Sequence, residues 1–71
     1  MGKLLSSKEI ICVLLNQGFV FVSQKGSHAK YRKHSPKSTR TVIVPCPKRE
    51  IPLGTFVSIL RQSGLSKEDF K

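Results

Sequence analysis

The apolar positions near the start of the chain predict an amphipathic helix. Isoleucine and leucine pairs recur three to four residues apart in the segment SKEIICVLLNQ, and this spacing places them on one helix face. The four residues are Ile10, Ile11, Leu14 and Leu15. Ser6, with Glu9 three residues later, predicts a capping box, and Gly18 supplies a left-handed end. We therefore expect a helix over about residues 7–17, with Cys12 inside its apolar run as part of the core.

Three segments with the composition of β-strands follow this helix. The run FVFV at residues 19–22 is β-branched and aromatic, and the turn sequence SQKGS comes directly after it. A second strand is expected over residues 28–34, and a third over residues 40–44, which Pro45 and Pro47 terminate. We expect these three strands to pair antiparallel.

Alternation sorts the side chains of the second predicted strand into an apolar and a cationic face. Ala29 and Tyr31 point to one face, which should be turned toward the core. The residues that point to the other face are His28, Lys30, Arg32 and His34.

The last third of the chain predicts a second helix. Its buried face is marked by Leu53, Phe56, Ile59 and Leu60. Gly64 ends it, and Ser66 with Asp69 forms a cap signal for a short terminal turn. The predicted fold is α+β: helix, three-stranded antiparallel sheet, helix, in a single domain over residues 1–71. Two helices can cover one sheet face, which leaves the cationic row on the other face or at its rim.

The charge balance predicts a polyanionic partner. The 71 residues include 13 Lys and Arg but only 4 Asp and Glu, which gives a formal net charge of +9. Residues 25–49 contain eight of these cations and no acid. A field of one sign over a third of the molecule attracts polyanions, of which nucleic acid is the commonest. A merely solubilising surface is the alternative, but solubility does not require acids to be excluded from a segment.

The chain offers little else that would suggest a cofactor or a membrane. Cys12 and Cys46 form no CxxC pair and have no metal-ligand spacing, so they are expected to be free thiols in a reducing compartment, Cys46 in a loop. The longest apolar run, IICVLL, is too short for a secretory signal. We therefore expect a cytoplasmic protein that binds no membrane and no small-molecule cofactor.

Two histidines, His28 and His34, are the candidate proton-transfer groups. They lie six positions apart on one predicted strand, or roughly 20 Å, which is too far to serve one scissile phosphate. His28 is the better placed because it follows the turn Lys25, Gly26, Ser27. Glycine lets the backbone approach a phosphate closely, and the serine adds a hydroxyl donor.

A single imidazole beside cations can cleave RNA without a metal. It removes the proton from a ribose 2′-hydroxyl, whose oxygen attacks the adjacent phosphorus, so the substrate carries its own nucleophile. Cations stabilise the charge that builds on the phosphate oxygens. An ordinary imidazole titrates near neutral pH, which suits this role. The chemistry alone leaves open that His28 is a surface residue with no role, or one contact of a non-catalytic RNA-binding module.

The segments QKGSHAKYRK and VPCPKREIPLGTFVSILRQSGLSKEDF, with the order of elements and the length, resemble the HicA-type toxins, the small ribonucleases of toxin–antitoxin pairs. The resemblance implies a fold similar to double-stranded-RNA-binding domains and cleavage of mRNA. It also implies that the histidine of the GSH motif, here His28, is catalytic, and that a HicB-type antitoxin covers the site. Many members carry a second histidine where this chain has Pro47, so the leaving-group proton would have to come from water or a lysine.

The resulting candidate site has His28 as the catalytic residue and no metal. The candidate RNA-binding residues are Lys25, Gly26, Ser27, Lys30, Arg32 and Lys33. The same cationic face would also suit a protein that only binds RNA, or one that pairs with an acidic protein partner.

Overall fold

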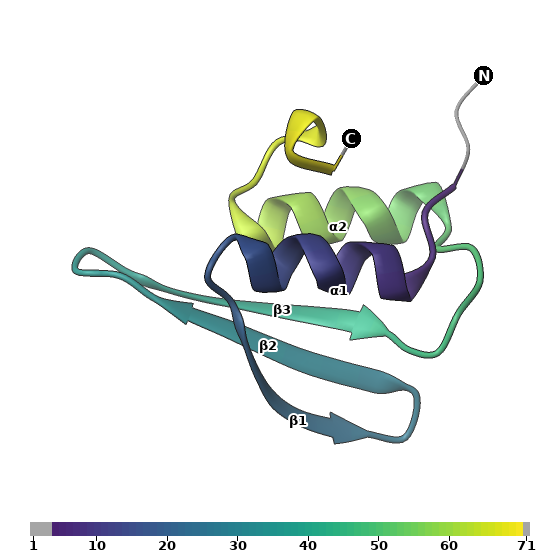
Figure 1. The fold of residues 1–71 in the computed structure, drawn as a ribbon, viewed down its shortest axis with the longest axis horizontal. Helices are drawn as coiled ribbons and strands as arrows, with labels where there is room; N and C mark the ends of the chain where they lie inside the picture. Colours follow the sequence, from purple (N-terminus) through teal and green to yellow (C-terminus); the bar gives the residue numbers. More distant parts are fainter. Residues whose placement is uncertain (1–3, 71) are drawn as a thin grey trace.

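A computed structural model describes residues 4–70 (Figure 1). The elements, in chain order, are α1 (Ser7–Asn16), β1 (Val20–Lys25), β2 (His28–His34), β3 (Thr39–Pro45), α2 (Leu53–Ser63) and a 3-10 helix, η1 (Lys67–Phe70). The strands form one antiparallel sheet in the order β1-β2-β3. The predicted α+β class and the order helix, three strands, helix are therefore confirmed.

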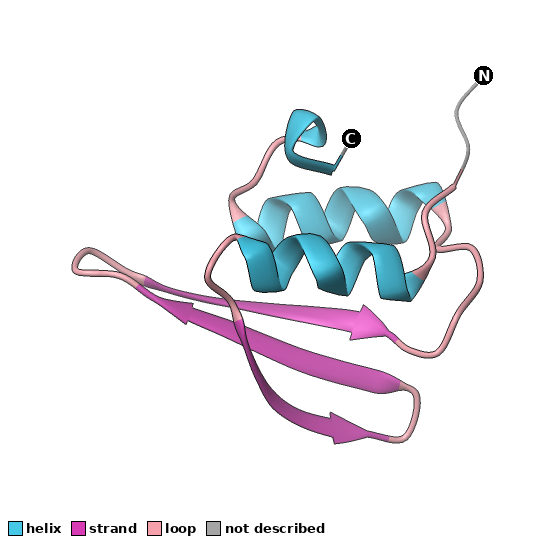
Figure 2. Ribbon diagram, in the orientation of Figure 1, coloured by secondary structure: helices cyan, strands magenta, loops and turns pink. Residues whose placement is uncertain are grey.

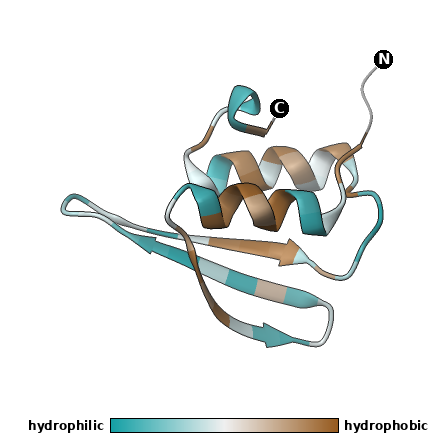
Figure 3. Cartoon of the chain, viewed as in Figure 1, coloured by the Kyte–Doolittle hydropathy of each residue, from teal (hydrophilic) through white to brown (hydrophobic). Residues whose placement is uncertain are grey.

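Both helices lie on the same side of the sheet (Figure 2). The buried core between the two layers consists of Ile10, Leu14, Phe19, Ala29, Tyr31, Val42, Val44, Ile51, Ile59 and Phe70. The helices pack mainly against β3, whereas all six residues of β1 are exposed. The start of β1 and the last part of β3 are hydrophobic, while β2 is mostly hydrophilic (Figure 3). The sheet is thus covered at its β3 side and open at its β1 side.

The local signals at the ends of α1 act as predicted. The Ser6 side chain accepts a hydrogen bond from the Glu9 amide at 3.1 Å, and the Glu9 carboxylate accepts one from the Ser6 amide at 2.9 Å. Gly18 has a φ of 96°, a left-handed conformation that favours glycine. The helix ends at Asn16, one residue earlier than predicted, with Gln17 as its C-cap.

The predicted apolar face of α1 was too wide. Ile10 and Leu14 are fully buried, but Leu15 is 50% exposed and Cys12 is exposed. At 3.6 residues per turn, Cys12 lies about 200° around the helix from Ile10, and Leu15 about 100° from Leu14. The expectation that Cys12 belongs to the core is therefore wrong, because only one narrow stripe of α1 meets the sheet.

The first strand is longer and more exposed than its sequence suggests. β1 begins at Val20 and continues through polar residues to Lys25, instead of ending at position 22. The polar residues belong to the strand because their main chain pairs with β2. This pairing continues to Lys25, which lies opposite His28. Phe21 is 55% exposed, and its ring meets the ring of Tyr31 edge-on at a centroid distance of 5.7 Å.

The second helix buries part of its predicted face. Ile59 is buried and Phe56 is half-buried, but Leu53 is 61% exposed because it is the first residue of α2, beyond the part of the helix that covers the sheet. Gly64 ends the helix with a φ of 73°, as predicted. The predicted terminal cap is confirmed, since the Ser66 amide donates to the Asp69 carboxylate at 2.9 Å.

Two cations of the β2–β3 hairpin lie at the C-terminal ends of the helices. Lys33 and Arg40 are paired across the two strands. The Lys33 ammonium lies 5.9 Å from the centroid of the Phe19 ring, and a Cβ on Gly18 would lie 3.4 Å from the Lys33 side chain. A Cβ on Gly64 would lie 2.6 Å from the Arg40 guanidinium. Because the C-terminal end of a helix carries partial negative charge, both cations stabilise the helix layer.

The loop between β3 and α2 is tied to the start of α1 by Ser7, a buried polar residue with 4% exposure. The Ser7 amide donates to the Lys48 carbonyl at 2.9 Å, and the Lys48 amide donates to the Ser7 hydroxyl at 3.0 Å. The Ile51 amide, three residues after Lys48, donates to the Leu5 carbonyl, two residues before Ser7, at 2.7 Å. These bonds join segments more than 40 residues apart in the sequence.

We expect Ser7→Ala to lower the free energy of unfolding by about 1–3 kcal/mol, because the Lys48 amide loses its partner in a half-buried place. Urea unfolding followed by circular dichroism measures this. Ser58→Ala is the matched control, since Ser58 lies exposed on α2, and it should change stability by less than about 0.5 kcal/mol. Equal stabilities of the two variants would contradict the role of Ser7.

Candidate functional site

His28 is the first residue of β2 and comes directly after the turn that ends β1. Gly26 in this turn has a φ of 59°, and a Cβ built on it would meet no atom within 4 Å. The positive φ favours glycine at this position, whereas neighbouring atoms would leave room for a side chain. The space beside Gly26 is therefore open to a ligand. The His28 side chain is exposed, and no residue of the described part of the chain, 4–70, hydrogen bonds to its ring.

The turn is fastened to the segment that follows β3. The Cys46 amide donates to the Ser27 carbonyl at 2.8 Å. The Gln24 side-chain amide donates to the carbonyls of Gly26 and Cys46, at 3.2 and 3.1 Å. In the ladder, His28 stands opposite Pro45 on one side and Lys25 on the other. The backbone around His28 is thus held by all three strands.

The face of β2 that carries His28 is turned away from the helices. Ala29 and Tyr31 are buried, as the alternation predicts. Lys30 and Arg32 share the other face with His28, and the register adds Lys25 to the same face from β1. We call this surface, with Lys25, His28, Lys30 and Arg32, the open cationic face.

No acid compensates these cations within the sheet. Glu9 belongs to α1, Glu50 to the loop before α2, and Glu68 and Asp69 to η1. All four acids of the chain therefore lie in or next to the helix layer. The neighbour that orients Arg32 is neutral: its Nε donates to the Thr41 hydroxyl at 3.3 Å. The charge of the open cationic face is therefore available to a polyanion.

The second imidazole is remote from the first. His34 is the last residue of β2, at the opposite end of the strand from His28. Its Nδ1 lies 3.0 Å from the Thr39 hydroxyl. The two histidines therefore cannot act on one phosphate, as predicted from their spacing.

The predicted RNA-binding residues divide into two groups. Gly26 and Ser27 adjoin His28 in the turn, and Lys25, Lys30 and Arg32 lie with it on the open cationic face. Lys33 instead points to the helix side, where its ammonium lies over the Phe19 ring. The structure thus brings five of the six residues together with His28, while their roles remain predictions.

Tyr31 supports β2 from the helix side. Burial raises the pKa of its hydroxyl above the ordinary value, and the nearby Cys46 raises it further. The phenol therefore stays neutral at physiological pH. Among the residues that sequence reasoning missed, Gln24 and the main chain of Cys46 are the most prominent, since a single glutamine in a strand gives no signal of its hydrogen bonds to distant carbonyls.

Pro47 lies next to the site in the chain. It follows Cys46, whose amide bonds the Ser27 carbonyl. A proline side chain has no group that donates a proton, so this position contributes no acid to the site. The sequence-based expectation that a leaving-group proton must come from elsewhere is unchanged.

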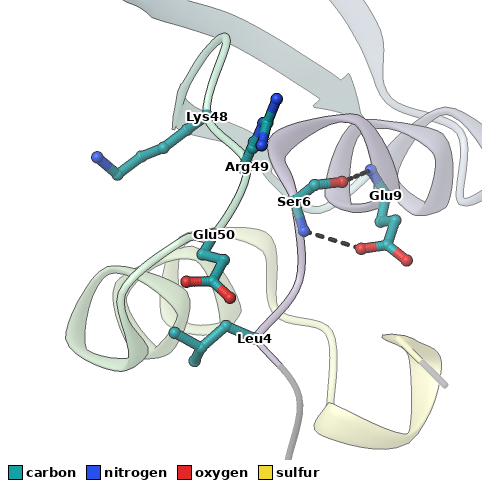
Figure 4. Close-up of a pocket in the computed structure, with 6 residues that line it drawn as sticks. All are labelled: Leu4, Ser6, Glu9, Lys48, Arg49 and Glu50. Carbon is teal, nitrogen blue, oxygen red and sulfur yellow. Dashed lines mark hydrogen bonds between the residues drawn. The ribbon is translucent and has the colours of Figure 1, made fainter.

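A separate hollow lies at the start of α1 (Figure 4). The residues that line it are Leu4, Ser6, Glu9, Lys48, Arg49 and Glu50. Its lining has as many acids, Glu9 and Glu50, as cations, Lys48 and Arg49, so it suits a polyanion less well than the open cationic face does. We therefore regard the open cationic face as the candidate site.

The described residues offer neither a metal-binding cluster nor a membrane-spanning helix. Residues 4–70 contain no group of three or more His, Cys, Asp or Glu side chains that could hold a metal ion. Within the same described range, neither helix has the length and apolar character needed to cross a membrane.

Comparison with known proteins identifies the family. The chain matches no curated protein. Residues 7–65 match the family described as HicA toxin of bacterial toxin-antitoxin. The matched range begins at the first residue of α1 and includes all three strands, the turn before His28 and all of α2. Because this match covers well over half of the sequence, the chain belongs to the HicA family, the toxins of bacterial toxin–antitoxin systems.

Proposed function

We propose that the protein is a cytoplasmic, metal-independent endoribonuclease that cleaves mRNA, blocks translation and is neutralised by a HicB-type antitoxin. The observation that carries the proposal is the exposed imidazole of His28, which lies beside Lys25, Lys30 and Arg32 on a sheet face without acids. Membership of a toxin family supports a harmful activity of this kind.

RNA binding is assigned to the open cationic face. Lys30 and Arg32 follow His28 at intervals of two residues, or about 7 Å along a strand. Side chains at this spacing can contact successive phosphates of a single strand while the scissile phosphate lies at His28. The Gly26 turn leaves the backbone space that such an approach needs.

In the proposed reaction, the His28 imidazole takes the proton from a ribose 2′-hydroxyl. The 2′-oxygen attacks phosphorus and the bond from phosphorus to the 5′-oxygen breaks, which leaves a 2′,3′-cyclic phosphate and a 5′-hydroxyl. Cations of the face stabilise the charge on the phosphate oxygens. The departing oxygen takes a proton from water or from Lys25, the residue opposite His28 in the ladder.

A non-catalytic RNA-binding module is the second candidate, because the open cationic face would serve it equally well. An interaction protein with an acidic partner would also use this face. The two binding functions share one chemical signature, since they leave RNA ends unchanged. The variants and substrates below therefore separate catalysis from binding.

His28→Ala should abolish growth inhibition and lower RNA cleavage by at least about 100-fold, the usual scale of a lost general base. The fold should persist, because His28 is exposed and its truncation creates no core cavity. His34→Ala is the control and should cleave normally. Cleavage is measured with a labelled RNA, and folding by circular dichroism. Undiminished cleavage by folded His28→Ala would exclude the catalytic assignment.

RNA affinity should fall steeply with salt, because phosphate contacts release counterions. In a His28→Ala background, the double change Lys30→Gln and Arg32→Gln should reduce the slope of log affinity against log salt by about 1.4, at about 0.7 per contact. The matched control is Arg61→Gln with Lys67→Gln, one Arg and one Lys exposed on the helix layer. Fluorescence anisotropy gives the slopes. Equal slopes for the two double variants would show that RNA does not bind through Lys30 and Arg32.

An RNA with one 2′-deoxy or 2′-methoxy sugar at the cleaved position should bind almost normally and remain uncut there. EDTA should have no effect, and the upstream product should carry a 2′,3′-cyclic phosphate, detectable by mass spectrometry. A metal-activated water would instead tolerate the deoxy sugar and fail in EDTA. Cleavage at the full rate at the 2′-deoxy position would exclude the 2′-hydroxyl mechanism, even if His28 were essential.

A further inference from the structure

We propose that Gln24 is a positioning residue for the His28 site, which holds the β1–β2 turn in place through its side-chain amide. The proposal rests on the proposed ribonuclease function. Gln24 touches neither substrate nor reacting atoms in it, and acts through the backbone that carries His28.

The contacts of Gln24 join the two segments that border His28. Its Nε2 donates to the Gly26 carbonyl at 3.2 Å and to the Cys46 carbonyl at 3.1 Å. A glutamine amide has two N–H donors, so both are engaged. The bond from the Cys46 amide to the Ser27 carbonyl, at 2.8 Å, joins the same two segments through the main chain.

The turn needs this support because it lies at the uncovered side of the sheet. All six residues of β1 are exposed, and the helices pack mainly against β3. His28 belongs to the last pair of the β1–β2 ladder, opposite Lys25. The ends of strands and the turns beside them open more readily than strand centres. A displacement of about 1 Å at a catalytic group can lower a rate by about 100-fold.

The chemistry of the position defines which side chains can replace glutamine. Both partners of the Gln24 amide are carbonyl oxygens, so the position needs N–H donors. Methionine has a similar length but no donor, whereas lysine offers three donors at the end of a chain of similar reach. Gln24→Met therefore removes the interaction, and Gln24→Lys can restore it.

The first test compares kcat and KM of the full chain and its variants on a labelled RNA. Gln24→Met should lower kcat by about 10- to 100-fold and change KM by less than about threefold, because the cations of the open cationic face are untouched. Gln24→Lys should recover most of the lost kcat. Gln62→Met is the matched control: the Gln62 side chain accepts a hydrogen bond from the Ile43 amide at 3.0 Å, which joins α2 to β3 and involves no residue of the turn. It should leave kcat unchanged.

The second test does not depend on activity. In a Cys12→Ser background, Cys46 is the single remaining thiol, and it is half-buried beside the turn. Gln24→Met should increase the rate at which an aromatic disulfide reagent modifies Cys46, while Gln62→Met should not. Circular dichroism of each variant shows whether the fold persists.

Each outcome bears on one proposal. Wild-type kcat and unchanged Cys46 reactivity in Gln24→Met would overturn the role of Gln24, as would a Gln24→Lys variant as impaired as Gln24→Met. If the wild type does not cleave RNA, or His28→Ala cleaves it normally, the ribonuclease function fails. In that case the reactivity of Cys46 still decides whether Gln24 holds the turn.

Discussion

The arrangement of the site depends on the hydrogen bonds that fasten residues 46–51. This segment is bonded at its start to the β1–β2 turn through Ser27, in its middle to α1 through Ser7, and at its end to Leu5. It therefore connects the sheet, the helix layer and the uncovered hairpin at one end of the molecule. Without these bonds, a chain of this size would have few contacts to hold an exposed turn beside the last residues of β3.

Alternation along β2 divides its cations between two uses. Lys30 and Arg32 lie on the open cationic face, where no acid is near them in the sheet. Lys33, one position further, lies over Phe19 at the C-terminal end of α1, and its partner Arg40 reaches the C-terminal end of α2. A net charge of +9 therefore overstates the charge that RNA would meet, because part of it stabilises the helices.

The features that could be predicted from the sequence are those decided locally. The capping box of Ser6 and Glu9, the left-handed Gly64 and the alternation around Tyr31 depend on neighbours within a few residues. The exposure of Leu53 and the tether of Ser7 depend on which parts of the chain meet across the fold, and no short pattern encodes that. The candidate site followed the same division: the common face of His28, Lys30 and Arg32 was predictable from the strand period, but the addition of Lys25 from β1, the position of Lys33 on the helix side and the hydrogen bonds that hold the turn were not.

The uncovered first strand has a consequence for the behaviour of the protein in solution. Val20, Phe21 and Val22 are exposed on an edge strand, an arrangement that invites a strand of another copy to pair with it. An irregularity between Phe21 and Ser23 interrupts the ladder there, and the positive charge of each copy repels the next. Salt screens this repulsion. High salt should therefore favour self-association of the protein, and it would also weaken the proposed binding of nucleic acid.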